Sequence, residues 1–369
     1  GWNVLGRWSR ALPEDSRLTV QGYVDYTYRD QMMLADQRTS LDFDAQYELS
    51  PIGRHKAIAG GRYRLSLDEL TESPFITATD TSRNDQLFSG FVQDKITLLP
   101  DAWFLTLGSK FEHNDYSGFE VQPNARLQWH IDDTQMAWAS IAHAVRTPSQ
   151  LEQDLTIAYI AGFFGLLPNP SFDSEEVVAY ELGYRRQLTP TLLLDIAAFY
   201  NDYDKISATS VASSGPFPIN VTITNGTTAE TYGGEIVLDW RTSDTLNLSA
   251  SYSFLDMQLH GPAGAINPEV AEGQSPQHQF NARSQWNIRD DLFFDTMLFY
   301  VDSLPDFNVK THWRLDMGLG WKIDERLRFN LVGQDLLNGV HREFTSLSDP
   351  FTPAAKIERS VYGKFTWSF

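Results

Sequence analysis

The segment FEHNDY, residues 111–116, places two carboxylates, an imidazole and an amide next to one another, at Glu112, Asp115, His113 and Asn114. Carboxylate and imidazole groups are common ligands of metal ions. Consecutive side chains of an extended strand point to opposite faces, so these four would not converge on one ion without ligands from elsewhere in the chain. We therefore expect no metal site in this segment.

Five cationic or aromatic residues are better candidates for ligand binding. Each falls at or near the end of an expected strand, where a long connection begins or ends. A cation or a ring at such a place could contact an anionic chelate. The alternative is that each belongs to the polar lining of a wide interior and is held there by ion pairs and hydration. The candidates are His143, Arg146, Tyr203, Arg283 and Arg359.

Other chemistry has little support in the sequence. No nucleophile-elbow, zinc-protease or phosphate-loop pattern occurs, so we expect no catalytic residues, no cofactor, no metal and a protein that is not an enzyme. The net charge of -19 argues against a nucleic-acid partner, because phosphate binding needs clustered Lys and Arg. The chain has no cysteines, which excludes disulfides and thiolate metal sites.

The elements that must position the candidate residues are β-strands. Apolar and polar residues alternate with period two in many segments, which gives each strand one apolar and one polar face. Clear examples are VQPNARLQWHI at 121–131, LNLSASYSF at 246–254 and WRLDMGLGWKI at 313–323. We count seventeen such segments of about 9 to 15 residues, which is long enough to cross a bilayer at a tilt. No apolar run reaches the roughly 18 to 20 residues of a membrane helix, which excludes a helical membrane protein.

The connections between these segments alternate between two kinds. Short ones lie at 12–16, 50–53, 100–101, 132–133, 189–190, 242–244, 289–291 and 324–325, and long ones near 30–36, 68–84, 113–120, 146–173, 205–229, 259–275, 302–311 and 338–355. All tight turns would then lie at one end of the sheet. This pattern predicts an all-β, antiparallel transmembrane barrel with apolar faces toward lipid. A large soluble β protein is the alternative, but its strands are usually shorter and its turns are not segregated by length.

Two apolar features fit this interpretation. We expect outward-facing tryptophans beside the membrane interfaces, at Trp129, Trp240, Trp313, Trp321 and Trp367. The apolar run IAYIAGFFGLLP at 157–168 lies inside the longest connection, where it would either contact an apolar ligand or pack on other loops. Packing within the loops is the more common outcome for long compact connections.

Several stretches resemble the C-terminal barrel of TonB-dependent outer-membrane receptors. These are AVRTPSQLEQDL at 144–155, the segments 174–206 and 314–344, TYGGEIVLDW at 231–240, SPQHQFNARSQW at 275–286, and the terminal strand. The resemblance implies a 22-stranded barrel with a plug inside it, in the outer membrane of a Gram-negative bacterium. It also implies import of a ferric siderophore or similar scarce nutrient. The terminal YGKFTWSF resembles the signal read by the outer-membrane assembly machinery, with Gly363, Trp367 and Phe369 at the matching positions.

The sequence departs from this family in one respect. Seventeen segments are five fewer than 22, and neither a plug nor a TonB box is found in the 369 residues. We therefore expect residues 1–369 to be an incomplete barrel, on which TonB would act only through the missing plug. The expected partners are outer-membrane lipid, the nutrient ligand and the assembly machinery. A passive porin-like channel and a soluble β-rich binding protein are the alternative functions.

Overall fold

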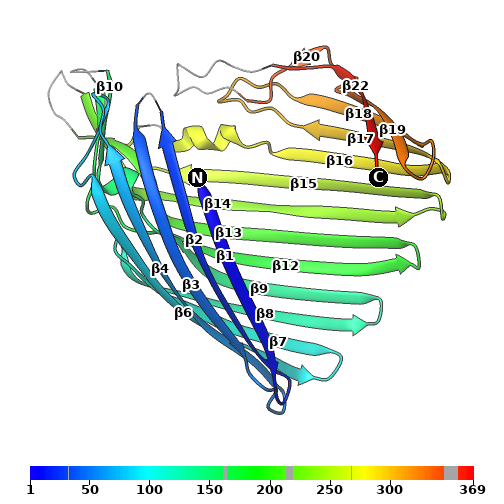
Figure 1. Cartoon of the computed structure of the whole chain (residues 1–369), viewed down its shortest axis with the longest axis horizontal. Coiled ribbons are helices and arrows are strands. Elements are labelled where there is room, and N and C mark those ends of the chain that lie inside the picture. The colour runs from blue at the N-terminus through cyan, green and yellow to red at the C-terminus, as the bar shows by residue number, and fades with distance from the viewer. Residues whose placement is uncertain (32, 161–163, 213–218, 267, 345–355) are drawn as a thin grey trace.

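A computed structural model describes residues 1–31, 33–160, 164–212, 219–266, 268–344 and 356–369. Its main element is a single large β-sheet (Figure 1). Among the described residues, no helix has the length and apolar character needed to cross a membrane. The short helix α1 (Gln150–Gln153) and a 3-10 helix (Pro268–Gln274) both lie in connections between strands.

Seventeen strands of eight or more residues make up the wall in the part of the chain that the structure describes, as the sequence predicted. They are β1 (Trp2–Leu12), β2 (Ser16–Asp30), β3 (Ala35–Glu48), β4 (His55–Thr71), β6 (Ser82–Leu99), β7 (Trp103–Asn114), β8 (Gly118–Asp132), β9 (Gln135–Arg146), β12 (Glu175–Thr189), β13 (Leu192–Val211), β14 (Ile219–Arg241), β15 (Leu246–His260), β16 (His278–Arg289), β17 (Leu292–Val301), β18 (His312–Lys322), β19 (Leu327–Gln334) and β22 (Ser360–Trp367).

Each wall strand pairs antiparallel with the next wall strand along the chain. Figure 1 shows the resulting curved sheet, with blue β1 and red β22 at its two edges. Among the described strands, β1 pairs only with β2, and β22 only with β19. The sheet is therefore an open, incomplete barrel.

The pairing register separates an apolar from a polar face, because facing residues of neighbouring strands share a side of the sheet. One row across β7, β8, β9 and β12 consists of Leu105, Leu127, Ala139 and Leu182. The adjacent row consists of Thr106, Arg126, Ser140 and Glu181. Apolar side chains thus cover the outer face, and polar side chains line the inner face.

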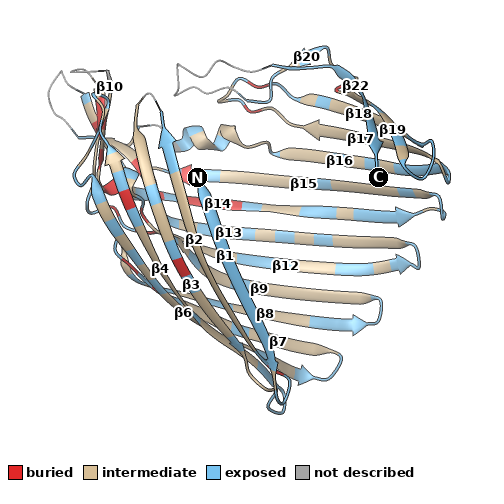
Figure 2. Ribbon diagram, viewed as in Figure 1, coloured by how far each residue is buried: buried red, intermediate tan, exposed pale blue. Residues whose placement is uncertain are grey.

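The apolar outer face is not enclosed by protein. Leu248, Leu315 and Phe329 are half-buried, and many large apolar side chains of the wall are exposed. Figure 2 shows exposed and half-buried residues along the strands, with buried residues gathered toward one end. A soluble protein would bury such a belt, whereas a membrane protein presents it to lipid.

Two connections that the sequence predicted to be long are short. Only residues 31–34 join β2 to β3, and only 115–117 join β7 to β8. In the second turn, the Asn114 side-chain oxygen accepts hydrogen bonds from the backbone N–H groups of Tyr116 and Ser117, and Gly118 has a φ of 78°. The 205–229 connection is also mostly strand, because β13 and β14 continue past the expected ends. Period-two alternation fades above the membrane, so it did not mark these strand ends.

The remaining long connections assemble a small sheet at the loop end of the wall. The strands β5 (Ile76–Ala78), β10 (Leu155–Ile160) and β11 (Phe164–Leu167) join the top of β14, with β11 parallel to β14. Ile157, Leu166 and Val221 form a buried core there. The described part of the 157–168 run therefore packs within the loops, and residues 161–163 lie outside the described residues. The other short strands, β20 (Val340–His341) and β21 (Ile357–Glu358), pair near the end of the chain.

Candidate ligand-binding site at the loop end

Arg146, the last residue of β9, joins three elements at the loop end of the wall. Its Nε lies 2.7 Å from Glu175 Oε2 and its Nη2 lies 2.9 Å from Glu175 Oε1, which is a two-pronged ion pair with the first residue of β12. Its Nη1 donates to Glu152 Oε1 of α1 at 3.0 Å. Both carboxylates form ion pairs with this guanidinium, so Arg146 holds α1 against the wall. This arrangement matches the alternative interpretation of Arg146 as a residue held by ion pairs.

Glu152 also caps the helix that it anchors. The backbone N–H of Ser149 donates to Glu152 Oε2 at 2.8 Å, which satisfies a group that the first turn of the helix would leave unpaired. Burial raises the pKa of Glu152, but the hydrogen bonds from Ser149 and the ion pair with Arg146 lower it by more. The net pKa is below the ordinary value, and the carboxyl is charged at neutral pH.

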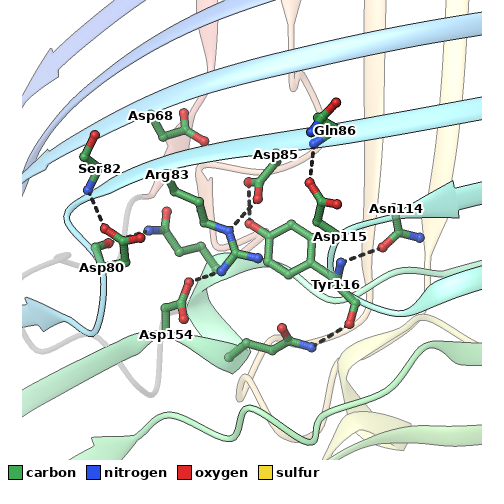
Figure 3. A network of polar contacts seen from close by, with 12 residues as sticks. Asp68, Asp80, Ser82, Arg83, Asp85, Gln86, Asn114, Asp115, Tyr116 and Asp154 are labelled. Carbon is green, nitrogen blue, oxygen red and sulfur yellow. Dashed lines mark hydrogen bonds and ion pairs between the residues drawn. The ribbon is translucent and has the colours of Figure 1, made fainter.

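A second polar network surrounds Arg83 at the start of β6 (Figure 3). The guanidinium lies between the carboxylates of Asp85 and Asp154 and forms ion pairs with both. Its central carbon lies 4.1 Å from the centroid of the Tyr116 ring, a cation–π contact. The Tyr116 hydroxyl donates to Asp85 Oδ2 at 2.7 Å. These contacts join β6, the β7–β8 turn and the residue that follows α1.

The environment of Tyr116 keeps its phenol neutral. Burial raises the pKa of Tyr116, the negative charge of Asp85 raises it further, and Arg83 offsets only part of the shift. The Tyr116 carbonyl accepts a hydrogen bond from Gln153 Nε2 at 3.2 Å, and the same nitrogen donates to the Phe172 carbonyl at 2.8 Å. Together with the contacts of Arg83, these hydrogen bonds hold α1 and the start of β10 against β6 and the β7–β8 turn.

Of the other predicted ligand contacts, Tyr203 and His143 fall on opposite faces. Tyr203 lies opposite Val177 and Ala229, and this register places it on the inner face. His143 shares a face of β9 with Ile141, which is the outer face. Its Nε2 lies 3.3 Å from Glu176, whose other oxygen accepts from Lys205 Nζ at 2.6 Å. His143 therefore belongs to an ion cluster outside the barrel and is not brought together with Tyr203.

Arg283 and Arg359 also differ in their placement. Arg283 lies in the middle of β16 and not at a loop-side end, so that part of the prediction was wrong. The connections expected at 259–275 and 289–291 already place Arg283 near the middle of the segment between them. On the inner face, the Nη2 atom of Arg283 lies 3.9 Å from Asp295 Oδ1. Arg359 precedes β22 and is exposed, and no side-chain partner of it occurs among the described residues. It is the predicted arginine that remains available at the loop end.

The predicted tryptophans all fall on the outer face. Trp129, Trp240 and Trp321 lie near the short-turn end, and Trp313 lies near the loop end, each with 40% to 47% of its surface exposed. Trp129 stacks on Trp103 with ring centroids 5.0 Å apart. On the edge strand β22, Gly363 and Trp367 face outward, and Phe369 follows the strand. The Phe329 ring packs beside Gly363, where an added Cβ would lie 3.2 Å from it.

The sequence did not single out the Arg83 network. Arg83 and Asp154 are 71 residues apart, and both lie in or beside segments that looked like ordinary polar loop. The only local signal was one acidic residue, Asp115, directly before the turn aromatic Tyr116. The two halves meet only because β10 pairs with β5, which follows β4 in the chain.

The family model for the β-barrel of TonB-dependent receptor-like proteins matches residues 3–336. The chain belongs to this family. The resemblance predicted from the sequence is therefore confirmed, and so is a location in the outer membrane of a Gram-negative bacterium. This family of TonB-dependent receptors is not a class of enzymes.

Individual relatives of this TonB-dependent receptor barrel are more distant. The iron-regulated outer membrane virulence protein of Vibrio cholerae is 26% identical over 254 residues, which are 66% of this chain and 38% of that protein. The ferric enterobactin receptor of Pseudomonas aeruginosa is 25% identical over 287 residues, which are 73% of this chain and 37% of that protein. The chain thus spans less than two fifths of the curated relatives that it matches.

Solved structures show the same fold. A ferric enterobactin receptor mutant of Pseudomonas aeruginosa in complex with enterobactin superposes with a TM-score of 0.76 at 17% identity, over 100% of this chain and 63% of that one. A siderophore receptor from Acinetobacter baumannii gives a TM-score of 0.74 at 14% identity, with the same coverages. These neighbours establish the architecture of this TonB-dependent receptor barrel and not its ligand.

Proposed function

We propose that this barrel is the membrane wall of an outer-membrane receptor for TonB-dependent uptake of a ferric siderophore. The observation that carries the proposal is the family match over residues 3–336, together with relatives named for iron regulation and for ferric enterobactin. The loop sheet formed by β5, β10, β11 and β14 supports it as well, because a fixed set of loops above the lumen can hold a large ligand in place.

The residues that we assign to ligand contact are those of the predicted set that the fold leaves available. Arg359 is an exposed cation at the loop end, and Tyr203 offers a ring on the inner face. A ferric chelate carries negative charge, for which a guanidinium is a suitable partner. Arg146 would act indirectly, by holding α1 and the start of β10 in place.

We further propose that additional strands and a plug complete the receptor. The edge strands β1 and β22 both run toward the short-turn end of the wall, so direct pairing between them would be parallel. Every wall pair in the described chain is antiparallel, and an odd number of strands between the two edges would keep closure antiparallel. Five would give 22 strands. TonB would then act on this barrel only through the plug.

The experiment is ligand binding and uptake by the whole receptor. We expect quenching of tryptophan fluorescence by a ferric siderophore but not by the iron-free form, and uptake of labelled iron that stops in a tonB deletion strain. Ferric catecholates, ferric hydroxamates, haem and cobalamin form the ligand panel. Failure to bind any of them would exclude the proposal. Steady ion conductance in planar bilayers without ligand would favour the porin-like alternative.

The role of the terminal strand in assembly also remains a proposal. Gly363 and Trp367 lie on the outer face of an edge strand, where an assembly factor could pair with the backbone and contact both residues. Deleting Phe369 from the whole receptor should lower its amount in the outer membrane while leaving its synthesis unchanged. Replacing the exposed Phe119, on the β8 strand, by Ala serves as the control for loss of an outward aromatic ring.

A further inference from the structure

Two histidines and a carboxylate meet near the loop end of β18. The ligand atoms of His312, His341 and Glu343 all lie within 4.8 Å of one another. His312 is the first residue of β18 and faces the lumen, while His341 belongs to β20 and Glu343 follows it. The two imidazole rings stack with centroids 4.5 Å apart. None of these residues belongs to the candidate ligand-binding site described above.

His341 lies between two carboxylates, one at each of its ring nitrogens. Its Nδ1 lies 2.9 Å from Asp335 Oδ2, and its Nε2 lies 3.0 Å from Glu343 Oε1. Carboxylates only accept hydrogen bonds, so a neutral imidazole can satisfy one of these contacts and not both. If Nδ1 carries the proton, the lone pair of Nε2 faces the Glu343 oxygen. A cation bound beside this pair of atoms could be coordinated by both Nε2 of His341 and Oε1 of Glu343.

Asp335 is built to hold His341 in that orientation. It is only 1% exposed, its backbone N–H donates to Asp316 Oδ1 at 2.9 Å, and its Oδ1 accepts from Asn338 Nδ2 at 3.0 Å. Only Oδ2 remains for His341. A carboxylate that accepts the Nδ1 proton of a histidine, so that Nε2 points to the metal, is the usual support of protein metal sites.

The local charge also favours a divalent cation. Three carboxylates, Asp316, Asp335 and Glu343, surround the group. Among the described residues, the one guanidinium in contact with them is that of Arg314. Its Nη2 lies 2.7 Å from Asp316 Oδ2, and its Nη1 lies 4.0 Å from Glu343 Oε1. Two imidazoles and one carboxylate match the donor preference of zinc and its neighbours and not that of calcium or magnesium.

We propose that His312, His341 and Glu343 form a binding site for a transition-metal ion of the zinc type, oriented by Asp335. Tetrahedral zinc with bonds of about 2.0 to 2.1 Å needs ligand atoms about 3.3 Å apart, so the group must contract by roughly 1 to 1.5 Å. Nε2 of His341 and Oε1 of Glu343 are already 3.0 Å apart, so the contraction concerns their distances to His312. The bound ion would join the 335–344 connection to β18. The pairing of β19 with β18 begins at Met317, so the residues of β18 before Met317 have no partner in β19.

The test uses the whole receptor, purified in detergent, with Zn²⁺ or Co²⁺ as the only ligand. We expect about one equivalent of metal by calorimetry and a tetrahedral Co²⁺ absorption band that excess Mg²⁺ does not remove. His341→Ala and Glu343→Gln should abolish that equivalent, and Asp335→Asn should weaken it by roughly 10- to 100-fold. His260→Ala, which removes an exposed histidine at the end of β15, should leave it unchanged.

Two outcomes would overturn the site. One is the absence of stoichiometric binding by the folded receptor. The other is binding that survives both His341→Ala and Glu343→Gln, which would place the metal elsewhere. Glu343 is exposed, so Glu343→Gln should fold even if His341→Ala does not, and it keeps the comparison decisive. The metal is added without a siderophore, so the result does not depend on the proposed uptake function.

Discussion

Replacing Arg83 by Met should release the loop sheet while leaving the wall intact. Arg83 is 18% exposed, and its partners Asp85 and Asp154 are 15% and 14% exposed. The substitution keeps an apolar side chain over Tyr116 but leaves two largely buried carboxylates without a cation. Removing one partner of a fully buried pair costs about 3 to 5 kcal/mol, and the partial exposure here reduces this to about 2 to 3 kcal/mol.

The effect should be local, because Asp154 connects α1 to β10 and the wall ladders do not depend on it. A loss of about 2 to 3 kcal/mol in local opening free energy corresponds to roughly 30- to 160-fold faster hydrogen exchange. Exchange measured by mass spectrometry should show this in peptides covering residues 150–160. Peptides from β16 should keep their protection.

The controls separate the charge effect from general damage. Arg326→Met removes an exposed arginine at a short turn and should change nothing. Adding Asp154→Asn to Arg83→Met removes one stranded charge and should restore part of the protection, as expected for coupled sites. Unchanged exchange at 150–160, or equal loss of protection in β16, would refute the assignment of Arg83 as the loop anchor.

Two further predictions concern the inner wall and the loop helix. Gly183→Ala places a Cβ 2.1 Å from the Trp138 ring nitrogen. It should lower the free energy of unfolding of the barrel by about 1 to 3 kcal/mol, measured by urea unfolding from lipid vesicles. The control Gly6→Ala, whose Cβ meets nothing within 4 Å, should be neutral. Because the folded-state pKa of Glu152 is lowered, its contribution is complete at neutral pH and is lost as the pH falls below the ordinary carboxyl range of about 4. Pepsin cleavage within 150–160, relative to cleavage of an unfolded substrate at the same pH, should therefore increase on acidification, and Glu152→Gln should remove that relative increase.

The wall could be predicted from the sequence because it is encoded locally. Alternation in a segment such as 246–254 fixes which face meets lipid, and the pairing of β15 with β14 and β16 follows from the order of the chain. The ends of the strands were less predictable. At the β7–β8 turn, Asn114 and Gly118 close the chain within three residues, although the polar composition there suggested a longer loop.

The candidate sites could not be predicted because their members come from distant segments. Arg83 meets Asp154 through the pairing of β5 with β10, and the parallel pairing of β11 with β14 has no local signal. The histidines at His312 and His341 similarly meet only because the connection after β19 returns to the top of β18. Of the five predicted ligand contacts, His143 lies on the outer face and not toward the lumen, for a different reason. Its strand continues beyond the membrane, where a polar residue on the outer face carries no penalty.

The open edges set the energetic requirement for the rest of the receptor. About half of the backbone N–H and C=O groups of an edge strand point away from its only partner. In hydrocarbon each unsatisfied group costs several kcal/mol, so the edges at β1 and β22 together would cost tens of kcal/mol. That exceeds the usual net stability of a folded domain, about 5 to 15 kcal/mol.

We therefore expect membrane insertion of this wall to depend on the proposed closing strands. Residues 1–369 produced alone should fail to form a protease-resistant species in lipid vesicles, whereas the same residues joined to the proposed closing strands should form one. Hydrogen exchange in peptides that cover Tyr362 of β22 offers a local check. Backbone protection of this strand should rise when the barrel closes. If residues 1–369 alone inserted as a stable, protease-resistant barrel, β1 and β22 would have to pair directly and in parallel, and the proposed odd number of closing strands would be wrong.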